Sequence, residues 1–300
     1  MLLKDFLRES TASLESLYPA GEARSMVMIL CEDLLGTKSY THIVDPGYVI
    51  DKSKETLLQD ALKRLQNGEP VQYVTGKASF CGRMFKVNSS VLIPRPETEQ
   101  LCKEAVRIGK VFQRLRLPYG HKAKPVRVLD LCCGSGCIAW TMCLSMPGCK
   151  VVGVDISEAA LAIAVGQDFS KEVKEVSASV PEFIRADVLD PEAALGEEKC
   201  DLILSNPPYI MEAERAFMRR NVLDFEPSLA LFVPNMDPLI YHRAIAGHSK
   251  RLLSPEGVGI TEVNESFAYE VQTLMKNSGF SESEILKDIF GKNRFVLYKK

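Results

Sequence analysis

The sequence places an amide, two prolines and an aromatic ring directly after an apolar run, in "DLILSNPPYI" at 201–210. Two successive prolines remove two backbone donors and fix two φ angles, and they disfavour a helical conformation at Asn206. The turn therefore offers the Asn206 side-chain oxygen and the Pro207 carbonyl as acceptors, with the Tyr209 ring beside them. Two acceptors and a ring face suit a planar NH₂ group. The alternative is that the two prolines only stiffen a turn that has no binding role.

A glycine turn and an acid follow two other expected strands. "LDLCCGSGCIA" at 129–139 contains Gly134 and Gly136, which permit a tight turn and a close approach of the backbone to a ligand. Asp155 ends the next expected strand, about 20 residues downstream, which is the spacing of an acid that binds ribose hydroxyls. The glycine pair alone is weak evidence, but together with Asp155 it favours a nucleoside ligand.

Two further acids indicate which nucleoside. A carboxylate at Asp130, where the first strand of this region ends, suits an ammonium group better than a pyrophosphate, which it would repel. Asp187 ends the third strand, where it could accept from an adenine amino group or simply cap a turn. S-adenosylmethionine carries an ammonium group, a sulfonium, a ribose and an adenine. Ala139 stands at the third glycine position of the dinucleotide fingerprint, so the loop by itself also admits NAD.

The chemistry expected at this site is alkylation of a planar nitrogen. An amide nitrogen is weakly basic. Its electron density rises when hydrogen-bond acceptors engage both of its N–H groups. A near-attack arrangement of donor and acceptor contributes about 7–11 kcal/mol. No strong general base is required, because the nitrogen becomes a strong acid once it is alkylated. The expected catalytic residues are therefore Asn206, Pro207 and Tyr209.

The elements that must position these residues fall into three stretches. Apolar residues at helical spacing predict helices up to Pro19, over 21–35 and over about 53–65. Alternation broken by glycine predicts a β-hairpin that links this region to the rest of the chain. The expected domains are a helical bundle at 1–70, a hairpin linker at 71–96 and the ligand-binding domain at 97–300. The helices could dock a partner or serve packing alone.

Strands and helices alternate in the third stretch, which predicts an α/β fold. The expected strands cover 126–131, 150–155, 182–187, 201–206 and 257–263, followed by a terminal hairpin. Repeated βαβ units imply a mostly parallel Rossmann-like sheet with helices on both faces, to which the hairpin adds an antiparallel strand. Ligands bind at the carboxyl ends of such strands. The strand before Asn206 is expected beside the strand before the glycine loop.

Composition limits the class of protein and its partners. Hydrophobic residues at 46% and charged residues at 25% of 300 are typical of a globular protein. No apolar run is long enough to span a bilayer and no secretion signal begins the chain, so we expect a cytoplasmic protein without membrane contact. A net charge of −2 disfavours direct nucleic-acid binding, which relies on many basic side chains. No feature of the sequence indicates an oligomer, so we expect a monomer.

Nine cysteines raise the question of metal binding or disulfides. Their number is odd and no short framework recurs. Cys132, Cys133 and Cys137 form a cluster, but no CxxC pair or nearby histidine completes a tetrahedral site. We expect reduced, mostly buried thiols and no metal.

Several stretches together resemble a known family. "NPPY" after the fourth strand is shared by methyltransferases that act on planar nitrogens: adenine or cytosine in DNA, and glutamine in protein. Longer stretches at 68–99, 129–139, 222–232 and 287–300 are similar to the protein-(glutamine-N5) methyltransferases of peptide chain release factors. The most specific of them is "GEPVQYVTGKASFCGRMFKVNSSVLIPRPETE" at 68–99. The resemblance covers nearly the whole chain.

The resemblance implies a helical N-terminal domain, a hairpin linker and a class I methyltransferase domain. The implied substrate is the glutamine in the Gly-Gly-Gln loop of a release factor, and the implied product of the donor is S-adenosylhomocysteine. The implied contacts of the methyl donor are Cys132, Cys133, Gly134, Ser135, Gly136, Asp155, Val188 and Asn206. The implied contacts of the substrate glutamine are Asn206, Pro207, Pro208 and Tyr209.

This chain departs from the family pattern at three places. Val188 replaces an expected aromatic residue, which predicts weaker stacking on adenine, and Pro238 replaces an expected glycine. The segment 261–266, "TEVNES", lacks the glycine that is expected after its acidic residue. Three rival functions remain open: a DNA adenine methyltransferase, which needs a basic cleft for a flipped base, a non-catalytic nucleoside-binding adaptor, and a dehydrogenase.

Overall fold

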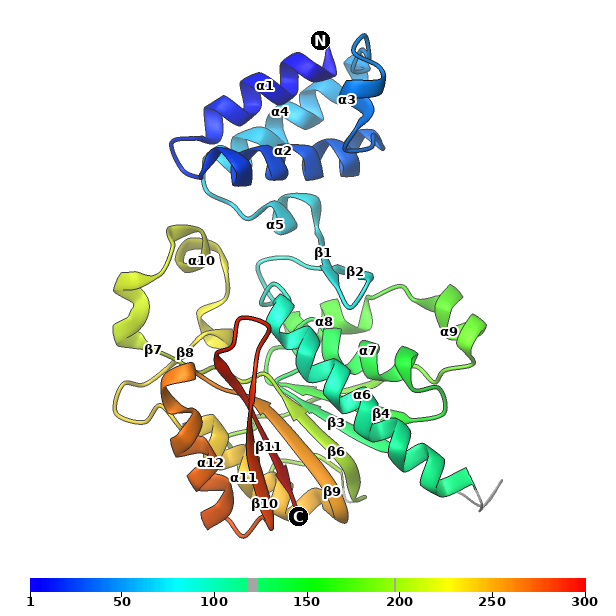
Figure 1. Ribbon diagram of the computed structural model, residues 1–300, viewed down its shortest axis with the longest axis vertical. Helices are drawn as coiled ribbons and strands as arrows, with labels where there is room; N and C mark the ends of the chain where they lie inside the picture. Colours follow the sequence, from blue (N-terminus) through cyan, green and yellow to red (C-terminus); the bar gives the residue numbers. More distant parts are fainter. Residues whose placement is uncertain (118–123, 197) are drawn as a thin grey trace. The chain divides into compact units, whose positions relative to one another are not determined.

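A computed structural model describes residues 1–117, 124–196 and 198–300 of the chain (Figure 1). The chain divides into two compact units. The first comprises Met1–Lys77 together with Met218–Glu226, and the second comprises Ala78–Phe217 together with Pro227–Lys300. The sequence pattern does not predict that the short segment 218–226 groups with the N-terminal helices.

The first unit is a set of helices. They are α1 (Leu3–Leu14), α2 (Ala20–Leu35), α3 (Thr41–Val44), α4 (Lys52–Gln66), α5 (Val71–Thr75) and α10 (Arg220–Phe225). Its apolar core is formed mainly by residues of α1, α2 and α4, and Leu14, Leu30 and Leu58 are fully buried in this core. Pro19 precedes α2, and Gly36 ends it with a φ of 72°, a conformation that glycine adopts without strain. The three helices predicted for this region are confirmed.

The β-hairpin is shorter than predicted. Strands β1 (Lys77–Phe80) and β2 (Arg83–Lys86) form it, whereas residues 71–75 form α5. Pro70 precedes this short helix and Gly76 ends it with a φ of 72°. Proline before a helix and glycine after it are common helix boundaries, so the first residues of the predicted hairpin linker form a helix and not an extended segment.

The second unit contains a seven-stranded sheet in the order β10-β11-β9-β6-β3-β4-β5 (Figure 1). Strand β11 runs antiparallel to both of its neighbours, and all other pairs are parallel. The predicted α/β fold with one antiparallel terminal strand is confirmed. The strands are β3 (Arg127–Leu131), β4 (Lys150–Asp155), β5 (Glu182–Arg185), β6 (Cys200–Ser205), β9 (Leu253–Glu262), β10 (Glu282–Lys287) and β11 (Asn293–Lys299). A separate pair consists of β7 (Ile210–Met211) and β8 (Phe232–Val233).

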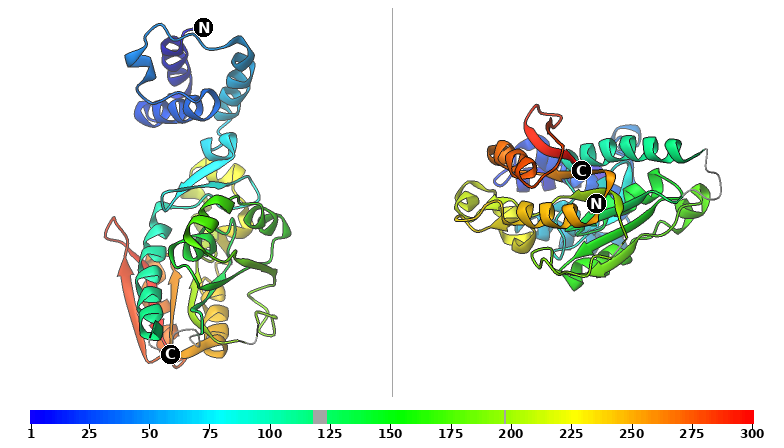
Figure 2. Two further views of the ribbon diagram at one scale, coloured as in Figure 1. Left: turned by 90° about the vertical axis from the view of Figure 1, so that its right-hand side faces the viewer. Right: turned by 90° about the horizontal axis from the view of Figure 1, so that it is seen from below.

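Helices cover both faces of this sheet (Figure 2). One apolar core lies under α6 (Pro96–Arg116), α7 (Cys137–Ser145) and α9 (Ser170–Val176). The core on the other face lies under α11 (Ile240–Leu252) and α12 (Ala268–Asn277). The described residues also form α8 (Glu158–Val165) and the 3₁₀ turns Glu212–Phe217, Ser228–Ala230 and Glu265–Phe267. No helix in the described ranges is both long and apolar enough to cross a membrane.

Candidate active site

A cavity opens at the carboxyl ends of β3, β4, β5 and β6. Its wall includes residues at or just beyond the end of each of these strands: Cys132–Ser135, Asp155–Ser157, Asp187, Val188, Asn206 and Pro208. From β3 the chain proceeds to β4 and β5 on one side and later returns to β6 on the other side. The cavity therefore lies at the point where the strand order reverses, which is the usual ligand position in open α/β sheets.

The glycine loop is held in left-handed backbone conformations. Cys132 has a φ of 61° and Gly134 a φ of 53°. Gly136 has a φ of 75° and precedes α7, and a Cβ at this position would meet the Cβ of Ala164 and the ring of Phe183 at 3.0 Å. Gly134 lines the cavity whereas Gly136 does not, so Gly136 serves the packing of the loop on α8 and β5.

Asp155 holds the glycine loop and faces the cavity. Its Oδ2 accepts the backbone N–H of Gly134 at 2.8 Å, and its Oδ1 accepts that of Ser157 at 2.9 Å. Burial raises the pKa of the Asp155 carboxyl, and these backbone N–H donors act in the opposite direction. The expected role of Asp155 on ribose stays a prediction, and its carboxylate has a second role in the shape of the loop.

Asp187 and Val188 also line the cavity. Asp187 Oδ1 accepts the Leu189 N–H at 2.8 Å, the turn geometry that was the alternative to adenine binding. Val188 is buried, and its carbonyl lies 2.8 Å from His248 Nε2. The only residue of α11 on the cavity wall, among those described, is Tyr241, which the sequence analysis missed. Burial raises the pKa of Tyr241 to about 12, and the negative charges of Asp187 and Asp155 add to this shift.

Asp130 is fully buried and is not part of the cavity wall. Its Oδ2 accepts the Ala139 N–H at 3.0 Å, and its Oδ1 has no hydrogen-bond partner within the described part of the chain. Burial raises the pKa of this carboxyl well above its ordinary value. Its expected contact with an ammonium group stays a prediction.

The cysteines of this region are buried thiols. All nine cysteines of the chain are free, and seven of them are buried, as expected. Burial raises the pKa of Cys137 to about 12, so this thiol is protonated at neutral pH. Within residues 1–117, 124–196 and 198–300, no group of three or more His, Cys, Asp or Glu side chains could hold a metal ion.

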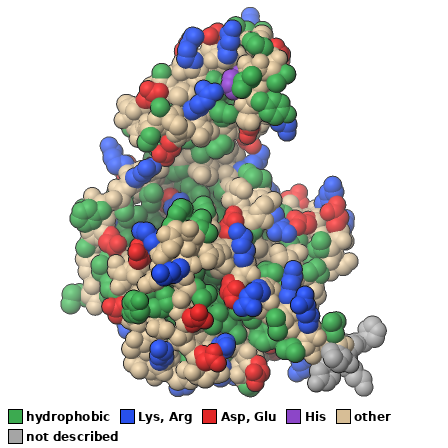
Figure 3. Space-filling model, in the orientation of Figure 1, with side chains coloured by type: hydrophobic (Ala, Val, Ile, Leu, Met, Phe, Trp, Pro, Cys, Tyr) green, Lys and Arg blue, Asp and Glu red, His purple; other side chains and the backbone are tan. Residues whose placement is uncertain are grey.

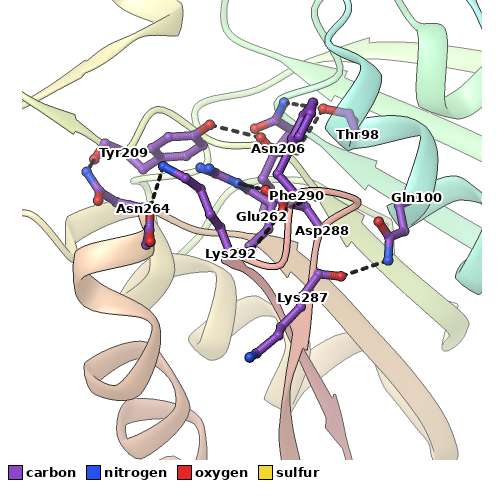
Figure 4. Close-up of polar contacts among 12 residues, drawn as sticks. Thr98, Gln100, Asn206, Tyr209, Glu262, Asn264, Lys287, Asp288, Phe290 and Lys292 are labelled. Carbon is purple, nitrogen blue, oxygen red and sulfur yellow. Dashed lines mark hydrogen bonds and ion pairs between the residues drawn. The ribbon is translucent and has the colours of Figure 1, made fainter.

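The NPPY turn is anchored by polar contacts from distant elements (Figure 4). Asn206 Nδ2 donates to Thr98 Oγ1 at 3.2 Å, and the Tyr209 hydroxyl donates to Glu262 Oε1 at 2.9 Å. Asn264 Nδ2 donates to the Tyr209 carbonyl at 3.4 Å. Asn206 and Pro208 line the cavity, whereas Pro207 and Tyr209 are not among its lining residues, so their expected contacts with the substrate stay predictions.

Glu262 and Thr98 were not predicted as site residues. Glu262 ends β9 and Thr98 lies in the first turn of α6, and both side chains are buried. Residues of the linker also line the cavity, namely Ser90, Val91, Leu92 and Pro94. Glu262 ends a strand at the ligand-binding edge of the sheet and is the acid of the segment 261–266, and this position is a signal that could have identified it.

Comparison with known proteins identifies the family. A family model described as PrmC N-terminal domain matches residues 5–76, and one described as Methyltransferase small domain matches residues 116–223. The release factor glutamine methyltransferase of Bacteroides thetaiotaomicron is 38% identical over 284 residues, which cover 95% of this chain and 95% of that protein. The chain belongs to the release factor glutamine methyltransferase family.

Two further similarities are found. The release factor glutamine methyltransferase of Flavobacterium psychrophilum is 31% identical, over 99% of this chain and 98% of that protein. A solved 16S rRNA N2 G1207 methyltransferase from Thermus thermophilus covers 75% of this chain and 49% of its own, with 18% identity and a TM-score of 0.44. Membership of the release factor glutamine methyltransferase family confirms the resemblance seen in the sequence, and the protein is a methyltransferase.

Proposed function

We propose that this protein transfers a methyl group from S-adenosylmethionine to the side-chain amide nitrogen of the glutamine in the Gly-Gly-Gln motif of peptide chain release factors. One observation carries the proposal. Gly134 and Asp155 of the expected donor site line the same cavity as Asn206 of the expected acceptor site. Membership of the family supports a release factor as the partner.

The residues around the cavity fit the methyl donor. The Asp155 carboxylate suits ribose hydroxyls, and Asp187 suits an exocyclic amino group. Asp130 is not on the cavity wall, but its Oδ1 has no partner among the described residues and would suit an ammonium group, which would offset the cost of burying that carboxylate. Leu92, Ile138 and other apolar side chains of the wall limit access of water. When bound, S-adenosylmethionine supplies a methyl group on a positively charged sulfur.

The NPPY turn would hold the acceptor nitrogen. Thr98 occupies the NH₂ end of the Asn206 amide, which leaves Oδ1 to accept one hydrogen of the substrate amide. The Pro207 carbonyl, next along the turn, would accept the other, and the Tyr209 ring would lie beside the plane of the amide. This arrangement favours the pyramidal nitrogen that in-line attack requires. The methylated nitrogen is a strong acid, so its proton leaves without a dedicated protein base.

The charge distribution favours a protein substrate over DNA. On the face drawn in Figure 3, lysine and arginine side chains are interspersed with aspartate and glutamate among the described residues. A flipped adenine would bring phosphates, whose binding needs clustered basic side chains and weakens steeply with salt. The proposal includes docking of the release factor by the helices of the first unit, and a cytoplasmic location remains a prediction.

The test is transfer of labelled methyl from S-adenosylmethionine to a purified release factor. We expect label on the wild-type factor, none on a factor whose Gly-Gly-Gln glutamine is alanine, and none on duplex DNA at physiological salt. Undiminished label on the alanine factor, or methylation of adenine in DNA, would overturn the proposal. Binding of donor without transfer to any acceptor would support the adaptor function instead.

A further inference from the structure

Glu262 is a buried carboxylate that the proposed reaction does not yet use. Its side chain is 1% exposed at the end of β9. Thr98 Oγ1 donates to its Oε2 at 2.7 Å, and the Tyr209 hydroxyl donates to its Oε1 at 2.9 Å. Figure 4 shows that Glu262 lies between the NPPY turn and the start of α6. Both of its oxygens are thus engaged by residues that contact or belong to the acceptor turn.

The direction of these hydrogen bonds determines how the Asn206 amide is turned. A threonine hydroxyl has a single hydrogen, and Thr98 gives it to Glu262. The Thr98 oxygen can then only accept, and it accepts from Asn206 Nδ2 at 3.2 Å. The oxygen end of the Asn206 amide is therefore turned away from Thr98. Were the Thr98 hydroxyl free to donate, it would bind either end of the amide.

We infer that Glu262 is a positioning residue that acts through Thr98 to fix the orientation of the Asn206 amide, so that its oxygen faces the substrate nitrogen. The inference rests on the proposed function and names two residues that set the geometry of its acceptor site. Tyr209 is held by the same carboxylate, so one buried group aligns both polar ends of the NPPY turn.

This positioning requires Glu262 to accept a hydrogen bond from Thr98, and the groups around Glu262 determine how readily its carboxyl ionises. Burial raises the pKa of the Glu262 carboxyl and the nearby Glu97 adds to this, whereas the Thr98 and Tyr209 hydrogen bonds and the Arg294 guanidinium favour the ionised form. Arg294 Nε in turn donates to Asp288 at 3.1 Å. His242 Nε2 of α11 lies 3.0 Å from the Glu262 backbone carbonyl, and burial lowers the pKa of this histidine to about 4.

The test compares matched variants of the full chain in methyl transfer to the release factor. Thr98→Val keeps the shape of threonine but removes the hydroxyl, and we expect kcat to fall roughly 10- to 100-fold, as for loss of a hydrogen bond to a charged group. Thr98→Ser should stay within about threefold of wild type because it keeps the hydroxyl. Thr98→Val combined with Glu262→Gln should fall no further than Thr98→Val alone, since the two residues act as one unit.

Further readouts separate positioning from a structural role. Thr98→Val leaves a buried oxygen of Glu262 without its donor, so its unfolding temperature should fall, whereas Thr98→Ser should stay close to wild type. Activities are therefore compared at a temperature where circular dichroism shows every variant folded, and at a concentration of S-adenosylmethionine that saturates each of them. As the pH falls, kcat of the wild type should decline through the protonation of Glu262, and Thr98→Val should lack this decline.

Three results would overturn this inference: unchanged kcat in Thr98→Val, a further fall in kcat when Glu262→Gln is added to Thr98→Val, or a loss of donor affinity that accounts for the whole effect. Failure of the wild-type protein to label the release factor would instead refute the proposed function, and this inference with it.

Discussion

The Asp155 carboxylate lies 2.8 Å from the backbone nitrogen of Gly134, so the acid expected to bind ribose also holds the loop that lines the donor cavity. Asp155→Ala should weaken S-adenosylhomocysteine binding by about 10- to 100-fold, since hydrogen bonds to a charged group contribute roughly 1.5–3 kcal/mol. Isothermal titration measures the affinity, and circular dichroism verifies the fold. A folded variant with unchanged affinity would contradict the ribose assignment.

Asp187 and Asp190 form the same kind of turn, which provides a matched control. Each Oδ1 accepts the backbone N–H two residues ahead, at 2.8 Å for Asp187 and 3.0 Å for Asp190, but only Asp187 lines the cavity. If Asp187 binds the adenine amino group, Asp187→Ala should weaken S-adenosylhomocysteine binding severalfold and Asp190→Ala should not. Equal affinities in the two variants would show that Asp187 is a turn residue alone.

Asp130 should make stability depend on pH. Burial raises its pKa above the ordinary 3.8, so its contribution to stability is complete below that pH and is lost as the pH rises through the raised value. Asp130→Asn removes the ionisable group and should become more stable relative to wild type over the same rise. Urea unfolding of both proteins across a pH series measures the difference. Parallel stability curves would contradict the buried, ionisable state of Asp130.

The same substitution tests the ammonium contact. Asp130→Asn should bind S-adenosylhomocysteine more weakly, because the amide lacks the charge that attracts an ammonium group. Affinity equal to that of wild type would remove Asp130 from the donor site.

Gly136 is required by both backbone conformation and packing, and Gly148 by conformation alone. Both have positive φ, 75° and 82°, but a Cβ at Gly136 would meet Ala164 and Phe183 at 3.0 Å, whereas one at Gly148 would meet no atom within 4 Å. Gly148→Ala should cost about 1–2 kcal/mol of unfolding free energy through backbone strain. Gly136→Ala should cost about 1–3 kcal/mol more through overpacking. Equal losses on urea unfolding would show that the loop relaxes around the added methyl.

Local signals in the sequence account for the parts of the site that were predicted. Glycines, acids and prolines directly after apolar runs mark the carboxyl ends of strands, and the fold brings those ends together at one cavity. Gly134, Asp155, Asp187 and Asn206 could be assigned to the cavity for this reason, whereas Cys132, Cys133 and Ser135 were expected there from the family resemblance. The pairing of β3 with β6 also followed from the expected topology.

The missed residues depend on contacts that no local pattern encodes. Thr98 and Glu262 are 164 positions apart and meet only because α6 begins beside the end of β9. Tyr241 reaches the cavity from α11, and the linker residues Ser90 to Leu92 reach it from before the sheet begins. The grouping of 218–226 with the N-terminal helices is likewise a matter of tertiary packing.

The central claim concerns which atom receives the methyl group. Tandem mass spectrometry of a release factor after reaction with this protein and S-adenosylmethionine locates that atom most directly. The account predicts one methyl group on the side-chain nitrogen of the Gly-Gly-Gln glutamine and none elsewhere, and no methyl when Asn206→Ala protein is used. Methyl groups on other residues with the glutamine unmodified, or the same modification by the Asn206→Ala protein, would contradict it.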